Sequence, residues 1–362
     1  RSTLFPYTTL FRSRTGGDLQ PFEVLEHGFG AIEALPGVTV ARDTAKTIDR
    51  EKRRVTLAGG STLAYERLVV SPGIALDYAS VPGWSKEGEE KMPHAWKAGP
   101  QTRLLKRQLE AVPDGGLIVI IAPPNPYRCP PAPYERVSVM AHVLKSTGRG
   151  ASRITVIDPK DKFSKQGLFQ QGWEKYYPGM IEWLPPEIHG GLKSVDPATM
   201  TVVTDFETYS SPALVNVIPR QTAGRIAVDA ELSDKEGYCP IDAFTMKSKK
   251  DSNIFVIGDS CIAGDMPKSA SAANSQAQAV ALIIVKELLD AKPGKITFDN
   301  RCWSLIAPND SVYVGGNYKP TEAKIEQTEN FISQMNDSPE QRRSNYQDGA
   351  SWYANLTSAL YG

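Results

Sequence analysis

The sequence predicts an α/β protein built around a βαβ unit of the nucleotide-binding type, and three stretches support this prediction. The apolar run "LIVIIA" (117–122) leads into a turn, a helix-forming stretch (133–150) and a second strand that finishes at Asp158. Strand, helix and strand with a terminal acid follow in this order in dinucleotide-binding folds. The strands "RLVVSPG" and "IFVIGDS" stand on either side of this unit, and each ends in a turn that contains glycine.

The other elements follow from hydrophobic periodicity and turn residues. Residues 16–37 predict a helix, and the alternating runs of 38–73 predict antiparallel strands. Residues 101–116 predict an amphipathic helix stopped by Pro and Gly. We expect short strands in 180–186, 192–206 and 213–221, a long apolar helix that ends near 289, strands in 301–318 and a polar, helix-prone tail.

Composition limits the partners. The 362 residues are 41% hydrophobic, which is enough for ordinary globular cores in two or three domains. Lys+Arg and Asp+Glu are both 41, so we expect no nucleic-acid partner. The apolar runs are much shorter than the roughly 20 residues that span a bilayer, which predicts no membrane span. The four cysteines and four histidines form no zinc-type cluster, so no metal site is expected.

The first residues have a separate origin. "TLFPYTTLFRS" (3–13) reads like the in-frame translation of a sequencing-library adapter. We therefore treat residues 1–13 as an artefact and leave them out of the fold prediction. The natural chain is then expected to enter near Arg14, already inside a domain, and a signal peptide would not be visible in this fragment.

The turn after residue 122 differs from a dinucleotide-binding turn. It reads "PPNPYRCPPAPYE", with prolines and Cys129 where a pyrophosphate site needs glycines. The prolines stiffen the loop and remove backbone N–H donors that a phosphate would need. The loop is therefore better suited to holding a sulfur atom in place; the prolines in question are Pro124, Pro126, Pro130 and Pro131.

Two further motifs predict a flavin site. A strand that ends in Gly258-Asp259 recurs in two-domain flavoproteins, where the carboxylate binds the ribityl chain of FAD; an ordinary strand end is the alternative. Ser71-Pro72-Gly73 ends another strand and is weaker alone. The stretch "MPKSASAANSQAQA" opens a helix whose N–H groups suit the flavin's pyrimidine edge, with Ser269 or Ser271 as a plain N-cap the alternative. The candidate residues here are Lys268, Ser269, Ala270 and Asn274.

From about Gly16 to its end, the chain resembles the flavoprotein subunit of flavocytochrome c sulfide dehydrogenase. The resemblance rests on "MPHAWKAGPQT", "NPYRCPPAPYERVS", "KDKFSKQGLFQQGW", "YPGMIEW", "YCPIDAFTM", "VIGDSCIAGDMPKSASAANSQA", "CWSLIAPNDSVYV" and "SWYAN". It implies two Rossmann-like dinucleotide-binding domains of the glutathione-reductase-like flavoprotein type plus a C-terminal α+β interface domain. The implied division is an FAD-binding domain in two parts (14–98 and 219–292), a degenerate NAD-like domain (99–218) and the interface domain (293–362).

The resemblance also implies the chemistry. Cys129 would pair with Cys302 beside the flavin, and Glu135 would move protons near the active cysteine. A merely stabilising disulfide or two unrelated buried thiols is the alternative for the cysteines, and a solvated helix-start acid is the alternative for Glu135. Cys239 and Cys261 are interpreted as packing residues and Trp96 as a core residue. Lys165, Gln166 and Tyr127 are left open between the flavin approach and an interdomain surface.

We therefore expect a periplasmic enzyme that oxidises sulfide to sulfur or polysulfide and passes electrons through FAD to a haem-bearing c-type cytochrome subunit. A sulfide:quinone oxidoreductase is the first alternative, although the C-terminal segment is polar throughout rather than membrane-docking. A NAD(P)H-dependent disulfide reductase is disfavoured because there is neither a CxxxxC pair nor a GxGxxG turn. A non-catalytic electron-transfer or scaffold subunit is the last alternative.

The chain departs from the family pattern at its beginning. The N-terminal βαβ unit with its GxGxxG turn is absent, as is the cysteine that attaches the flavin covalently. We therefore expect this fragment to bind FAD poorly and to leave an apolar sheet edge exposed. Stoichiometric uptake of FAD at submicromolar concentration would contradict the first expectation.

Overall fold

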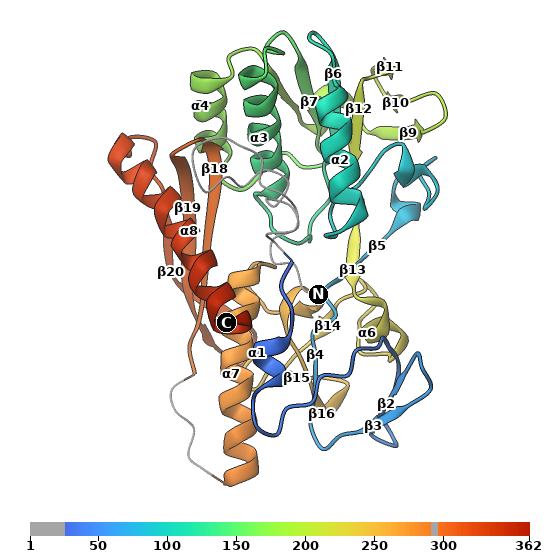
Figure 1. Cartoon of the computed structure of the whole chain (residues 1–362), viewed down its shortest axis with the longest axis vertical. Helices are drawn as coiled ribbons and strands as arrows, with labels where there is room; N and C mark the ends of the chain where they lie inside the picture. Colours follow the sequence, from blue (N-terminus) through green and yellow to red (C-terminus); the bar gives the residue numbers. More distant parts are fainter. Residues whose placement is uncertain (1–25, 291–295) are drawn as a thin grey trace.

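A computed structural model describes residues 26–290 and 296–362 of the chain (Figure 1). The adapter-like residues 1–13 lie outside these ranges, as does the first part of the helix predicted over 16–37. In the described part of that stretch only α1 (Gly30–Glu33) is helical, and it buries no residue. The prediction of a long helix is wrong there, because "ALPG" follows α1 and Gly37 adopts a φ of 77° that a helix does not tolerate.

The predicted βαβ unit is confirmed as the centre of a four-stranded parallel sheet. Its strands lie in the order β12-β6-β7-β8, and Ile118 of β6 pairs with Ile154 of β7. The strands are nearly completely buried, as expected when helices cover a parallel sheet. The bounds are β6 (Leu117–Ile121), β7 (Arg153–Ile157), β8 (Ile181–Leu184), β12 (Leu214–Val217), α2 (Pro100–Ala111), α3 (Ala132–Ser146), α4 (Gln166–Tyr176) and α5 (Pro186–His189).

A second part of the molecule is built on β4 (Leu68–Val70), β15 (Lys247–Ser248) and β16 (Asp251–Val256), followed by α7 (Ala270–Leu289). β4 runs parallel to β16, with Val70 opposite Val256, so their carboxyl ends meet at one edge. β4 is an edge strand, and Val69 on it is 40% exposed.

The remaining small elements complete these two parts. The predicted antiparallel strands near the start are confirmed as β1 (Ala45–Asp49), β2 (Arg54–Leu57) and β3 (Thr62–Ala64). The others are β5 (Ile74–Leu76), β9 (Leu192–Asp196), β10 (Thr201–Thr204), β11 (Thr208–Ser210), β13 (Gln221–Ala223), α6 (Arg225–Asp229), β14 (Cys239–Pro240), β17 (Cys261–Ile262) and the short 3₁₀ turns η2 (Tyr78–Ser80), η3 (Gly88–Glu90) and η4 (Gly258–Ser260).

The C-terminal residues form a third layer that connects the two parts. Strands β18 (Phe298–Ala307), β19 (Asp310–Pro320) and β20 (Ile325–Ile332) make an antiparallel sheet, and α8 (Pro339–Tyr361) packs on it. β18 packs against α3 of the parallel-sheet part and against α7 of the second part, and Figure 1 shows the sheet running alongside both. Residues of this sheet therefore reach the boundary between the two other parts.

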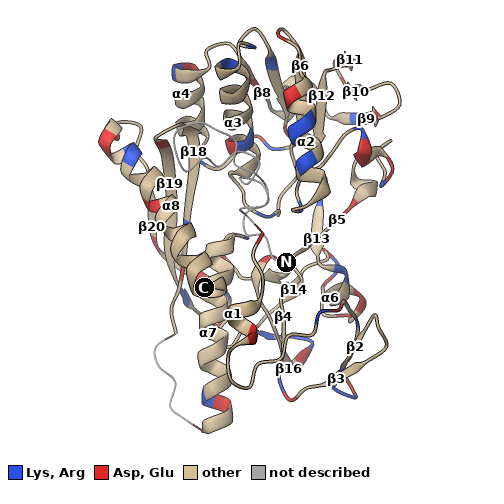
Figure 2. Cartoon of the chain, viewed as in Figure 1, with Lys and Arg blue, Asp and Glu red and all other residues tan. Residues whose placement is uncertain are grey.

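Charge and burial agree with an α/β protein that has several cores. The buried apolar residues form three clusters, of which the largest surrounds β6, α3 and β7. Acidic and basic residues are interspersed along the chain in all parts of the molecule (Figure 2). Over residues 26–290 and 296–362, no helix has both the length and the apolar character that a bilayer crossing requires.

Candidate active site

The loop between β6 and α3 holds Cys129 in a constrained backbone conformation. Cys129 has a φ of 56°, in the left-handed region that side chains other than glycine seldom adopt. Its N–H donates to the carbonyl oxygen of Lys268 at 2.7 Å, and its own carbonyl accepts from Ala132 N at 2.9 Å. Such conformations persist only where neighbouring contacts impose them, and they gather at functional sites. The thiol is therefore fixed by the fold.

The residues of the same loop that precede Cys129 are bound to the second part of the molecule. Arg128 N donates to the Gln221 side-chain oxygen at 2.9 Å, and the Tyr238 hydroxyl donates to the carbonyl of Pro126 at 3.0 Å. The guanidinium of Arg128 lies 3.8 Å from the Asp259 carboxylate. These contacts place the proline-rich turn directly beside the Gly258-Asp259 strand end.

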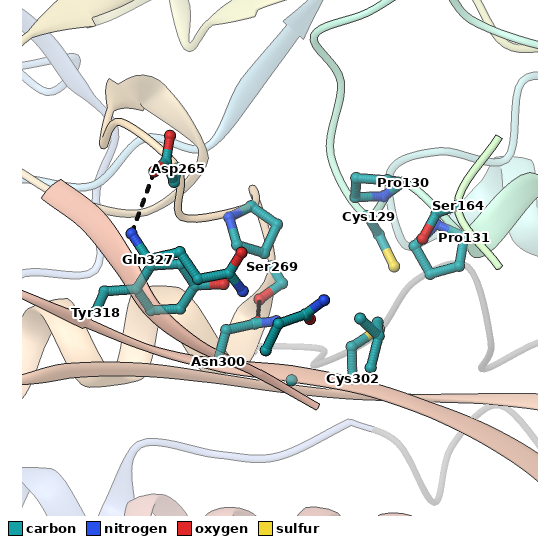
Figure 3. A pocket seen from close by; sticks show the side chains of 14 residues that line it. Cys129, Pro130, Pro131, Ser164, Asp265, Ser269, Asn300, Cys302, Tyr318 and Gln327 are labelled. Carbon is teal, nitrogen blue, oxygen red and sulfur yellow. Dashed lines mark hydrogen bonds between the residues drawn. The ribbon is translucent and has the colours of Figure 1, made fainter. Parts of the chain in front are cut away.

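Cys302 on β18 meets Cys129 across a cavity of about 200 Å³. Figure 3 shows the Cys129 sulfur pointing from its loop toward the strand that carries Cys302. Neither residue forms a disulfide in this structure; Cys129 is buried and Cys302 partly buried. A hydrogen bond from Cys129 is the main cause that lowers the pKa of Cys302 to about 6, with the charge of Lys165 and a hydrogen bond from Ser304 acting in the same direction against burial.

Three buried polar side chains surround the two thiols. Lys165 donates from Nζ to the Ser304 hydroxyl at 2.8 Å, and Ser304 lies on the same face of β18 as Cys302 because side chains alternate along a strand. Glu135, in the first turn of α3, is 5% exposed, and its Oε1 accepts from Leu305 N at 3.0 Å. The predicted solvated position of Glu135, which was the alternative to a role near the cysteine, is therefore wrong: its carboxylate is buried against β18.

The two predicted flavin motifs lie together at the carboxyl ends of β4 and β16. Gly258 has a φ of 71°, and a side chain there would have its Cβ 3.3 Å from the Ser71 hydroxyl. The carbonyl of Gly73 accepts from the Ser260 hydroxyl at 2.5 Å, and Pro72 packs directly on Gly224. The backbone at this edge is therefore held close and free of bulky side chains.

Asp259 provides the test of whether this edge fits the expected FAD. Its Oδ1 is buried and has no hydrogen-bond partner, and burial raises the pKa of the carboxyl group despite the nearby Arg128 and Lys268. An unpaired buried carboxylate oxygen is costly unless a ligand donates to it. A ribityl hydroxyl is such a donor, so Gly258 and Asp259 fit this part of the cofactor.

The start of α7 has the serine N-cap that the sequence analysis gave as an alternative. Ser269 is the N-cap: its hydroxyl accepts from Ala272 N at 3.0 Å and donates to Asn300 at 2.5 Å. The side chain of Lys268 donates to the carbonyls of Asp259 and Cys261 and lies over the Tyr238 ring. Ser269 also lines the cysteine cavity, and Ala270 and Asn274 are partly buried in the first turns. Contacts from the start of α7 to a flavin would thus come from its backbone. The side chain of Lys268 instead holds the loop that contains Asp259 and Cys261.

Other residues that the sequence analysis named are buried in the core or in the loop before Cys129. Cys239 and Cys261 are buried in a core cluster, and burial raises the pKa of each to about 12. Trp96 is fully buried under the guanidinium of Arg136, which confirms its interpretation as a core residue. Tyr127 is buried and donates to the carbonyl of Pro130 at 2.6 Å.

Sequence reasoning missed three contributors to this site. Arg128 lies beside Asp259, Gln276 accepts from Gly258 N at 2.7 Å, and Ser304 connects Lys165 to the face of Cys302. Ser304 could have been predicted from the sequence, since a residue two positions after Cys302 on a strand lies on the same face. Arg128 and Gln276 had none, because their roles depend on contacts between distant segments.

Comparison with known proteins agrees with this arrangement. Residues 102–219 match the family model described as sulfide dehydrogenase [flavocytochrome c] flavoprotein chain, central, and residues 295–360 match flavocytochrome c sulphide dehydrogenase, flavin-binding. A mitochondrial sulfide:quinone oxidoreductase from Mus musculus is 22% identical over 269 residues, which cover 68% of this chain and 55% of that protein. The chain thus spans about half the length of this relative.

Solved structures show the same fold. The sulfide:quinone oxidoreductase of Aquifex aeolicus superposes with a TM-score of 0.74 at 16% identity, over 99% of this chain and 82% of that one. A ferredoxin reductase from Rhodopseudomonas palustris gives a TM-score of 0.62 at 17% identity, over 92% and 79%. The prediction of a two-domain flavoprotein fold with a C-terminal domain is therefore confirmed.

Proposed function

Because the chain belongs to the family of flavocytochrome c sulfide dehydrogenase flavoprotein chains, whose cofactor is FAD, we propose that it oxidises hydrogen sulfide through Cys129 and Cys302. The electrons would pass through FAD to a c-type cytochrome subunit, and the setting would be the periplasm. One observation carries the proposal: two thiols from separate parts of the fold share a hydrogen bond and one cavity.

The chemistry starts from the oxidised pair, a Cys129–Cys302 disulfide. Hydrosulfide attacks the Cys129 sulfur; a new S–S bond forms, the protein disulfide breaks, and Cys302 leaves as a thiolate. Cys302 is the better leaving group because its hydrogen-bond donors and Lys165 hold its pKa low, and thiols of low pKa leave faster. The products are a persulfide on Cys129 and a thiolate on Cys302.

The second half of the cycle restores the disulfide. The Cys129 persulfide and the Cys302 thiolate together lose two electrons and one proton, release one zero-valent sulfur and join again. Bound FAD supplies the two-electron acceptor and the route to a one-electron partner. The net change is HS⁻ to zero-valent sulfur, one proton and two electrons. Glu135, buried within the same group of side chains, receives the proton.

A second candidate is sulfide:quinone oxidoreduction, favoured by the likeness to the mouse and Aquifex aeolicus proteins. The same cysteine chemistry would serve it, so the two differ only in the electron acceptor. The C-terminal helix α8 is polar in composition, with only Arg342, Asn345 and Gly349 buried. It lacks the strong apolar face of a membrane-docking helix, which favours the cytochrome.

The test is sulfide-dependent reduction of cytochrome c and, separately, of a short-chain quinone by the flavin-loaded protein. We expect rapid cytochrome reduction and a loss of at least roughly a hundredfold in Cys129→Ser, since the attacked sulfur is then missing. Cys261→Ser is the matched control and keeps the wild-type rate. Equal rates in wild type and Cys129→Ser would favour a non-catalytic scaffold, and reduction of quinone alone would favour the second candidate.

A further inference from the structure

Lys165 is a lysine that the fold buries next to the thiols. It is 6% exposed and precedes α4 with a left-handed φ of 62°, which turns its side chain into the protein. Its amine donates to the Ser304 hydroxyl at 2.8 Å and to the Val312 carbonyl at 3.4 Å, and both are neutral groups. Burying an ammonium group is costly unless negative charge compensates it.

The hydrogen bonds of Lys165 connect its ammonium group to one sulfur, that of Cys302. Because the Ser304 oxygen accepts from Lys165, its own hydrogen remains to be donated, and the Cys302 sulfur receives it. Cys302 and Ser304 are two residues apart on β18 and face the same side. Lys165, Ser304 and Cys302 thus form a line of donors that ends at the sulfur.

We propose that Lys165 is a positioning residue that keeps Cys302 as a thiolate, both by its charge and through the Ser304 hydroxyl that it holds in place. It thereby decides which cysteine leaves and which is attacked. The consequence for the order of attack and departure rests on the proposed function. The thiolate itself is a property of the reduced protein and needs neither flavin nor sulfide to be observed.

The other charged groups around Cys302 do not replace Lys165. Glu135 on α3 is acidic: its charge supports the ammonium group of Lys165 and cannot itself favour a thiolate, and Cys129 supplies a donor without charge. On α8, Arg342 is engaged by Asp310 of β19 at 2.6 Å. On β18 itself, Arg301 donates to the Tyr313 hydroxyl at 3.0 Å.

The test is the pH dependence of alkylation of Cys302 in the purified protein with its cysteine pair reduced. The rate of modification by iodoacetamide is followed by mass spectrometry of the Cys302 peptide in wild type, Lys165→Met and Lys162→Met. Lys162 is an exposed lysine three residues earlier and serves as the matched control. We expect the wild-type midpoint near pH 6. In Lys165→Met it should rise by at least about one pH unit, which is at least about fivefold less alkylation at pH 6.

Ser304→Ala provides a second variant that keeps the lysine and removes the hydroxyl; it should raise the midpoint by less than Lys165→Met does. Circular dichroism checks that each variant is folded. An unchanged midpoint in folded Lys165→Met and Ser304→Ala, or an equal shift in Lys162→Met, would overturn the inference. The sulfide assay of Cys129→Ser is independent of this result, so failure of one leaves the other standing.

Discussion

Two pairs of neighbouring cysteines in this molecule have opposite surroundings. Cys129 and Cys302 face a cavity, whereas Cys239 and Cys261 lie opposite each other in the ladder of β14 and β17 within a core cluster. A mostly buried lysine lies near each pair. Yet the pKa of Cys302 is lowered to about 6, and burial raises the pKa of Cys239 and Cys261 to about 12.

The difference lies in the hydrogen bonds that each sulfur makes. Cys302 receives hydrogen bonds from Cys129 and Ser304, and donors favour the thiolate. The Cys261 thiol instead donates to the carbonyl of Gly258 at 3.2 Å, which requires the neutral form. Lys268 directs its amine to two backbone carbonyls, so its charge does not overcome burial. Proximity of a lysine alone therefore does not activate a cysteine.

The largest expected effect is a contrast in thiol labelling. At pH 7 a pKa of about 12 leaves roughly one thiol in 10⁵ ionised, whereas Cys302 is mostly thiolate. Brief treatment of the reduced, folded protein with iodoacetamide should modify Cys302 and leave Cys239 and Cys261 unmodified. Lowering the pH through 6 should slow Cys302 labelling, since a thiolate is lost below its pKa. Peptide mass spectrometry measures all three, and labelling of Cys261 at a comparable rate would break the comparison.

One carboxylate lies near each cysteine pair, and replacing them should have different effects: Glu135 should affect turnover and Asp259 should affect cofactor binding. Glu135→Gln keeps the acceptor for Leu305 N but cannot take up a proton, so sulfide turnover should fall roughly tenfold to a hundredfold. Asp259→Asn should weaken FAD binding roughly tenfold, with turnover at saturating FAD unchanged. Stopped-flow rates and FAD titration measure these. Glu174→Gln, at an exposed acid on α4, is the control, and a wild-type rate in Glu135→Gln would remove the proton role.

Replacing the lysine near the inactive pair should lower stability and leave the acidity of Cys302 unchanged. Lys268→Met removes two hydrogen bonds to carbonyls and should lower the free energy of unfolding by about 1–3 kcal/mol. The pH midpoint of Cys302 labelling should not move. Denaturant unfolding measures the first and alkylation the second. The exposed Lys249→Met is the control, and a shift of the Cys302 midpoint in Lys268→Met would show that the two regions are coupled.

The smallest effect is expected for Cys239→Ala. Removing one buried sulfur from the core cluster should lower the free energy of unfolding by about 1 kcal/mol through a small cavity. Sulfide turnover should stay at the wild-type value, because this sulfur does not line the cysteine cavity. Paired unfolding curves and turnover rates give the answer; lost turnover in a folded variant would assign this pair a role in the chemistry.

The sequence by itself determined the local elements and the chemistry-bearing segments. Apolar runs of strand length predicted β6, β7 and β16, and the proline-rich turn marked Cys129 as a residue unsuited to a phosphate site. These predictions succeed because strand periodicity and proline geometry act over a few residues. The long helix predicted over 16–37 fails in its described part, since α1 buries no residue and the chain turns at Gly37 a few residues after it ends.

Only the tertiary structure decided which groups meet. Whether Cys129 lies near Cys302, whether Glu135 is buried, and where the amine of Lys165 points all depend on β18 packing against α3 at the boundary of the two other parts. The sequence left Lys165 open between two environments, and it gave no reason to treat Lys165 and Lys268 differently. A thiol's acidity depends on the direction of hydrogen bonds over a few ångströms, and that direction is set by packing between segments far apart in the chain.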